Sequence, residues 1–174
     1  MSLKKGDILL PVEGVSSYCS LIICRQEYEE TDKVGEMDVS ILLDHSWLQW
    51  LTPALREIRR GSPDRPAWSF TYPQYVTEFR KACRALGVDA VPYQARHSGA
   101  SEDRARGRRR QDEVQKRGRW SSIRSVMRYE KGGLLQQSAL QFSSELRVYL
   151  QACEARLGEI VLGTTADIPV PPPT

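Results

Sequence analysis

The residues best suited to chemistry lie in one basic segment, residues 96–131. This segment holds twelve lysines and arginines against five acidic residues, so it carries +7 while the rest of the chain carries −4. Such asymmetry indicates a polyanionic partner, most simply a nucleic-acid backbone, although a solvated basic helix face gives the same count. The sharpest local pattern also lies here: Gly118 and Trp120 precede Tyr129, and the tryptophan and tyrosine are nine residues apart.

This pattern resembles the last motif of the tyrosine recombinases, the phage-integrase class. In that family a glycine and then a histidine or tryptophan precede a helical stretch that ends in the nucleophilic tyrosine. Upstream, residues 93–101 read YQARHSGAS, which is similar to the family's HxxR box followed by its small-residue helix. Tyr93 stands where the box has histidine. The resemblance covers about residues 3–131, and the motif residues look most like recombinase-like genes of eukaryotic mobile elements.

The resemblance implies a mechanism of DNA breaking and rejoining. Tyr129 would attack a phosphodiester and become joined to a 3′ phosphate, and a 5′ hydroxyl would later reverse the step without ATP, metal or redox cofactor. Arg96 would hold the charged phosphate oxygens with its planar fork, and Trp120 would donate its indole N–H. Lys33, in a predicted hairpin like the one that carries the family's lysine, would protonate the leaving 5′ oxygen. Tyr93 can donate a hydrogen bond but is a poor proton shuttle near neutral pH.

One element of the family's site has no counterpart in the sequence. The family's first arginine precedes the initial strands of this domain, and we expect its position to lie upstream of Met1. Loss of one transition-state donor slows a reaction on the order of a hundredfold or more. The resemblance therefore leaves two functions open: site-specific recombination, or DNA binding by a truncated and catalytically impaired relic.

The bland interpretation of each candidate also stays open. A single tyrosine or tryptophan is more often a packing residue, a hairpin lysine is often solvated, and an arginine-rich loop can be a flexible solvated segment. His97 suits structural hydrogen bonding better than catalysis. In the DNA-binding interpretation, these arginines contact phosphates without reading bases: Arg104, Arg108, Arg109, Arg110, Arg117 and Arg119.

The elements that position these residues follow from the apolar patterns. Short β-branched runs at residues 8–10, 21–24 and 39–43 predict a small antiparallel sheet, with a hairpin tip near Lys33 and Gly35. Helical spacing predicts helices over about 47–58 and 75–86, then a helix that begins just after Tyr93 and breaks at Gly107 and Gly118. A last helix is expected over about 136–160, packed on the domain or on a neighbouring protomer. Tyr72, Tyr75 and Phe79 are expected in the core.

The bulk composition sets the class of protein. With 174 residues, 40% hydrophobic and 27% charged, the sequence predicts one mixed α+β, mostly helical domain over residues 1–162 and a disordered, proline-rich tail over 163–174. The tail and last helix leave open a third function, a protein-interaction module. Four cysteines without CxxC spacing indicate reduced thiols rather than a metal site. We expect no membrane span, an intracellular location that is nuclear in a eukaryote, duplex DNA as partner, and a homo-oligomer on DNA.

Overall fold

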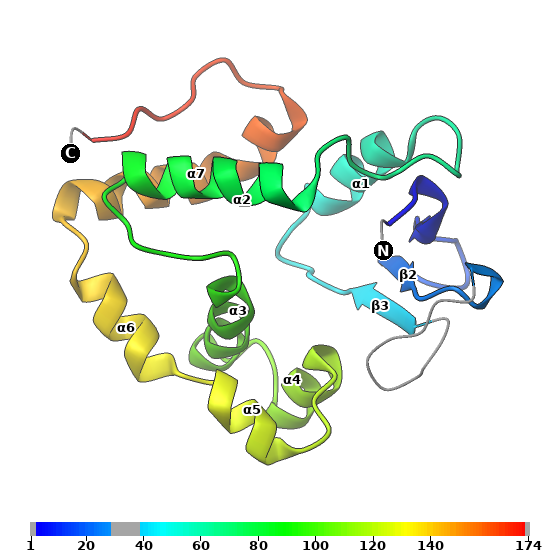
Figure 1. Ribbon diagram of the computed structural model, residues 1–174, viewed down its shortest axis with the longest axis horizontal. Helices are drawn as coiled ribbons and strands as arrows, with labels where there is room; N and C mark the ends of the chain where they lie inside the picture. The colour runs from blue at the N-terminus through cyan, green and yellow to red at the C-terminus, as the bar shows by residue number, and fades with distance from the viewer. Residues whose placement is uncertain (1–2, 29–38, 173–174) are drawn as a thin grey trace. The chain divides into compact units, whose positions relative to one another are not determined.

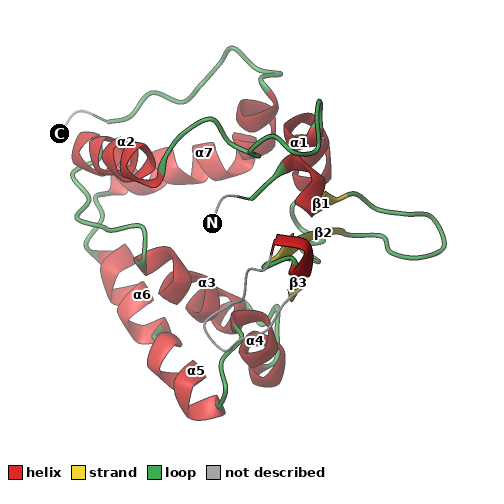
Figure 2. Cartoon of the chain, turned by 45° about the vertical axis from the view of Figure 1, so that its right-hand side comes forward, coloured by secondary structure: helices red, strands yellow, loops and turns green. Residues whose placement is uncertain are grey.

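The computed structural model describes residues 3–28 and 39–172, apart from the side chains of Tyr28, Arg96, His97 and Leu135. The chain has a mixed α+β fold in which helices outweigh a small antiparallel sheet, as expected from the sequence (Figures 1 and 2). It divides into two compact units. Unit 1 comprises Met1–Ser69 and Glu154–Ile168, and unit 2 comprises Phe70–Cys153 and Pro169–Thr174.

The sheet of unit 1 has the order β1-β2-β3, with every neighbouring pair antiparallel. Its strands are β1 (Ile8–Leu9), β2 (Cys19–Ile23) and β3 (Val39–Leu43). The register places Ile8 opposite Leu21 on one side, and Leu21 opposite Ile41 on the other. The three predicted apolar runs therefore do form strands, close to their expected bounds. Lys33 and the hairpin tip lie outside the described residues.

Helix α1 (Leu51–Arg59) covers this sheet with an apolar face. Its Leu55 shares a buried cluster with Ile8, Cys19 and Ala67, and Ile8 has no exposed surface at all. Pro53 occupies the first turn, where its missing N–H removes no helical hydrogen bond. The helix predicted from Trp47 thus begins about one turn later than expected, at Leu51.

A buried carboxylate ties the first turn of unit 1 to the end of β2. Asp7 is 5% exposed and accepts hydrogen bonds from Arg25 Nε at 2.5 Å and from the Lys4 amide at 2.7 Å. Arg25 also donates to the Gly6 carbonyl at 3.0 Å. Since a buried charge is tolerated only when it is paired and hydrogen-bonded, this network is structural.

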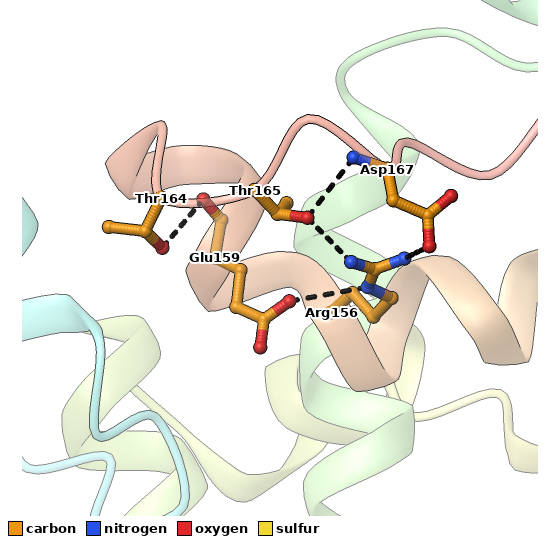
Figure 3. Close-up of polar contacts among 5 residues, drawn as sticks. All are labelled: Arg156, Glu159, Thr164, Thr165 and Asp167. Carbon is orange, nitrogen blue, oxygen red and sulfur yellow. Dashed lines mark hydrogen bonds and ion pairs between the residues drawn. The ribbon is translucent and has the colours of Figure 1, made fainter.

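Unit 1 also contains the end of the long helix α7 (Ser144–Leu162). After Gly163, at φ +65°, the chain turns back, and Arg156 of α7 binds Glu159, Thr165 and Asp167 (Figure 3). The hydrogen bond to Asp167, and then the one to Glu159, raise the pKa of Arg156 above its ordinary value. The first residues of the predicted tail are thus bonded to the helix that precedes them.

In unit 2, α3 contacts α4, α5 and α6 (Figure 1). Thr71 caps the first helix of this unit by accepting a hydrogen bond from the Gln74 amide. Gly87 and Gly107 adopt the left-handed backbone, at φ +63° and +62°, directly after helices that the sequence predicted to end there. The helices of this unit before α7 are α2 (Tyr72–Ala85), α3 (Gln94–Ala105), α4 (Gln111–Gly118), α5 (Ile123–Tyr129) and α6 (Gly132–Leu140).

Two expectations for these helices are wrong. The single last helix over 136–160 is instead two helices, α6 and α7, because Ser143 interrupts it: its hydroxyl accepts a hydrogen bond from the Leu146 amide and caps α7. Backbone and serine hydrogen bonds at this new helix start lower the pKa of Glu145.

The aromatic stripe of α2 is also not core. Tyr72 is 71% exposed, and α2 buries none of its residues. Tyr75 is stacked on Phe70, which precedes α2, with 6.3 Å between ring centroids, and it is tilted against Phe79 at 6.1 Å. Helical spacing identified the stripe correctly but not whether anything covers it.

Within the described ranges, no helix is both long enough and apolar enough to cross a membrane.

Candidate functional site

The candidate site is built on a small apolar cluster where α3, α4 and α5 meet. Ala100 of α3, Val114 of α4 and Val126 of α5 are all buried, and Val126 is fully so. Trp120 and Tyr129 are partly buried against this cluster. The same packing that holds the three helices together therefore also seats the two aromatic candidates.

The backbone at Gly118 and Arg119 folds Trp120 back toward α4. Arg119 adopts the left-handed conformation at φ 54°, and Gln115 Nε2 donates to the Trp120 carbonyl at 3.0 Å. The indole ring then occupies the space beside Gly118, since a Cβ there would lie 2.2 Å from a ring carbon. The glycine two residues before the tryptophan is thus required by the position of the ring.

Trp120 stacks on Tyr129, the residue in the nucleophile's position. Their ring centroids are 4.8 Å apart and the ring planes differ by 25°. Such offset stacking between aromatic rings contributes on the order of 1 kcal/mol beyond the area it buries. The stacking restricts the orientation of the Tyr129 ring.

The Tyr129 hydroxyl also lies close to a second tyrosine hydroxyl. Tyr93 directly precedes α3, is 59% exposed, and its oxygen is 3.1 Å from that of Tyr129. Either hydroxyl can be the donor. The structure therefore brings together three of the five predicted catalytic residues, Tyr93, Trp120 and Tyr129, from separate parts of the sequence.

The other two predicted catalytic residues are not described to the same extent. Position 96 belongs to the first turn of α3, just after Tyr93, but the Arg96 side chain lies outside the described part of the structure, as does that of His97. Lys33 lies outside the described residues altogether, in the segment between β2 and β3.

Sequence reasoning missed the residues that hold the chain just after Tyr129. Ser101 of α3, 2% exposed, donates to the Tyr129 carbonyl at 3.2 Å and accepts from the Lys131 amide at 2.8 Å. One turn further along α3, Arg104 Nε lies 3.2 Å from a Glu130 carboxylate oxygen. The small-residue helix after the HxxR-like box contains Ser98 and Ser101, and their residue type alone does not show that Ser101 is the one with these partners.

The predicted phosphate-binding arginines are paired within the chain to different degrees. Arg109 has a side chain only 10% exposed and lies 3.3 Å from Asp103, whereas Arg110 is 83% exposed and lies 3.2 Å from Asp112. Arg108 is 3.5 Å from Glu102. Arg119 is exposed, and Arg117, in the last turn of α4, is partly buried.

Comparison of the chain with protein-family models, with curated proteins and with solved structures finds no match.

Proposed function

We propose that this chain breaks and rejoins DNA strands through a covalent phosphotyrosine intermediate on Tyr129, as the resemblance to tyrosine recombinases implies. The observation that carries the proposal is that Tyr93, from the HxxR-like segment, lies beside Trp120 and Tyr129 of the second motif. The resemblance to the two family motifs points to these residues in the sequence. Nothing in their spacing along the sequence requires two hydroxyls to lie 3.1 Å apart.

The reaction follows from the chemistry of these groups. The Tyr129 oxygen forms a bond to phosphorus as the bond to the 5′ oxygen breaks, and its proton passes to water. The 5′ oxygen takes a proton from water or from Lys33. Negative charge that builds on the phosphate is offset by the indole N–H of Trp120 and by Arg96.

In this proposal, DNA is bound by those arginines that can give up a carboxylate of the chain and bind a DNA phosphate instead. An exposed ion pair contributes about 0–1 kcal/mol, so a phosphate can replace the carboxylate beside Arg110 at little cost. Arg119, which is exposed between Gly118 and Trp120, suits the same role. Arg109 does not, because withdrawing it from Asp103 would leave a largely buried carboxylate without its partner.

A covalent adduct tests the proposal directly. The chain is incubated at low salt with a library of nicked duplexes of randomised sequence, and the products are separated on a denaturing gel. We expect a slow-migrating, protease-sensitive species with the unaltered chain and with Tyr72→Phe, an exposed tyrosine of the same unit. Tyr129→Phe should remove it.

The same assay defines what would replace the proposal. If no adduct forms while duplex binding persists, the function is DNA binding without cleavage. If the adduct survives Tyr129→Phe, another residue is the nucleophile and the proposed site is wrong.

A further inference from the structure

Every residue of the segment Tyr129-Glu130-Lys131 is bonded to one face of α3. The Ser101 hydroxyl donates a hydrogen bond to the Tyr129 carbonyl and accepts one from the Lys131 amide, and Arg104 donates to the Glu130 carboxylate. Positions 101 and 104 are three apart, so they lie on the same side of the helix. We infer that Ser101 and Arg104 form a clasp that positions the Tyr129 hydroxyl for attack. This inference rests on the proposed function.

Helix α5 needs such a clasp because it is short. It has seven residues, and Val126 is its one buried residue. An isolated helix of this length is unstable in water, so its orientation depends on tertiary contacts. Val126 fixes the middle of α5, while the clasp fixes the end that carries the nucleophile.

Ser101 is well suited to this role by burial and by valence. A hydroxyl has one hydrogen to donate and lone pairs to accept. Ser101 uses the hydrogen for the Tyr129 carbonyl and a lone pair for the Lys131 amide, on either side of Glu130, the residue that follows α5. At 2% exposure, water cannot easily substitute for these bonds when the hydroxyl is removed.

The sequence predicts that Arg104 contacts a DNA phosphate, but its hydrogen bonds within the chain favour a positioning role instead. Its Nε lies 3.2 Å from Glu130, and its Nη1 donates to the Arg109 carbonyl at 3.3 Å. The guanidinium therefore links the end of α5 to the loop between α3 and α4. To bind a DNA phosphate with the same donors, Arg104 would have to release both partners.

The clasp also joins the nucleophile to the helix that follows Tyr93. Helix α3 begins directly after Tyr93, carries position 96 in its first turn, and holds the chain after Tyr129 through its last two turns. A reacting group displaced by about 1 Å loses on the order of a hundredfold in rate. Helix α3 thus fixes the distance between the Tyr129 end of α5 and position 96, the proposed phosphate-binding position.

The test separates positioning from DNA binding. Ser101→Ala and Arg104→Gln are compared with Arg106→Gln, a neighbouring arginine that pairs with Glu102. We measure the cleavage rate at saturating nicked duplex and, separately, the affinity for the same duplex. Both clasp variants should cleave on the order of ten- to a hundredfold more slowly, with affinities close to that of Arg106→Gln.

Exchange of the charged partners provides the rescue. The double variant Arg104→Glu with Glu130→Arg restores the ion pair in the opposite sense and should recover most of the cleavage rate that Arg104→Gln loses. If Arg104→Gln instead weakens duplex affinity more than Arg106→Gln, with an unchanged rate at saturation, Arg104 is a phosphate contact and the clasp is refuted.

A readout without DNA keeps the clasp distinct from the proposed function. Amide hydrogen exchange at Lys131 should accelerate in Ser101→Ala and stay unchanged in Ser138→Ala, a variant at an exposed serine of α6. Unchanged protection of Lys131 in Ser101→Ala would overturn the clasp, even if the unaltered chain cleaves DNA. Faster exchange in a chain that forms no adduct would retain the clasp and reject the phosphotyrosine chemistry.

Discussion

At the scale of single residues, the space beside Gly118 explains why the motif needs glycine. The Trp120 ring occupies the volume that a side chain at Gly118 would fill, with three ring carbons within 2.6 Å of an added Cβ. Neither the ring nor the backbone can move by so much without breaking the stack on Tyr129. Glycine here therefore serves close packing of an aromatic ring, a role that does not require an unusual φ.

We predict that Gly118→Ala displaces Trp120 and slows adduct formation as strongly as loss of the indole does. The expected fall is on the order of a hundredfold in rate, because the displaced ring takes both a phosphate donor and the stacking partner of Tyr129 away. Adduct yield with nicked duplex is compared between Gly118→Ala, Trp120→Ala and Gly133→Ala, whose added methyl meets open space. A Gly118→Ala chain that reacts at the full rate would contradict the proposed donor role.

At the scale of elements, two helical glycines with different surroundings make opposite predictions. Gly158 of α7 packs against Trp50 within unit 1, and an added Cβ would lie 2.8 Å from the Trp50 Cβ. Gly99 of α3 is exposed, and a Cβ there meets nothing within 4 Å. Alanine is intrinsically better than glycine in a helix interior by about 0.5–1 kcal/mol.

Gly158→Ala should therefore destabilise the fold by about 1–3 kcal/mol, since overpacking outweighs the gain in helix propensity. Gly99→Ala should stabilise it by roughly 0.5–1 kcal/mol. Thermal or urea unfolding of the two variants beside the unaltered chain measures both signs. A stabilising Gly158→Ala would mean that α7 does not pack against Trp50 as described.

The elements that the sequence predicted well are those whose ends carry local signals. Gly87 and Gly107 mark helix ends, and Tyr93 marks a helix start, because the backbone conformation after a helix or before one depends on a few adjacent residues. The break between α6 and α7 also has a local cause, the Ser143 cap, but the apolar spacing that continues across it concealed it. Apolar spacing reports a face and not a continuous helix.

The candidate site was predictable only in part, for a physical reason. The resemblance to the family motifs indicated Tyr93, Trp120 and Tyr129, which the structure brings together. It did not select Ser101, since a buried serine differs from a solvated one only by its tertiary partners. The pairing of Arg109 with Asp103 could not be predicted from the sequence for the same reason, because a count of charges does not distinguish a buried, paired arginine from an exposed one.

At the scale of the whole molecule, the uneven charge leads to a prediction about salt. The segment 96–131 keeps an excess of +7, but ion pairs inside it, such as Arg104 with Glu130 and Arg109 with Asp103, already engage part of its basic side chains, so the number of arginines overstates the number of DNA contacts. Each phosphate contact contributes about −0.9 to the slope of log affinity against log salt concentration. The slope thus counts the contacts that are made in solution.

We expect Arg110→Gln to reduce the magnitude of that slope by about 0.9, because the Arg110 side chain is 83% exposed and exchanges Asp112 for a phosphate. Arg59→Gln, at an exposed position of α1 in unit 1, should leave the slope unchanged, and so should Tyr129→Phe. Duplex affinity is measured by fluorescence anisotropy between 50 and 200 mM salt, roughly the range over which such contacts dominate. Equal slopes for Arg110→Gln and the unaltered chain would show that Arg110 does not contact a phosphate. An affinity independent of salt would contradict the proposed DNA interface as a whole.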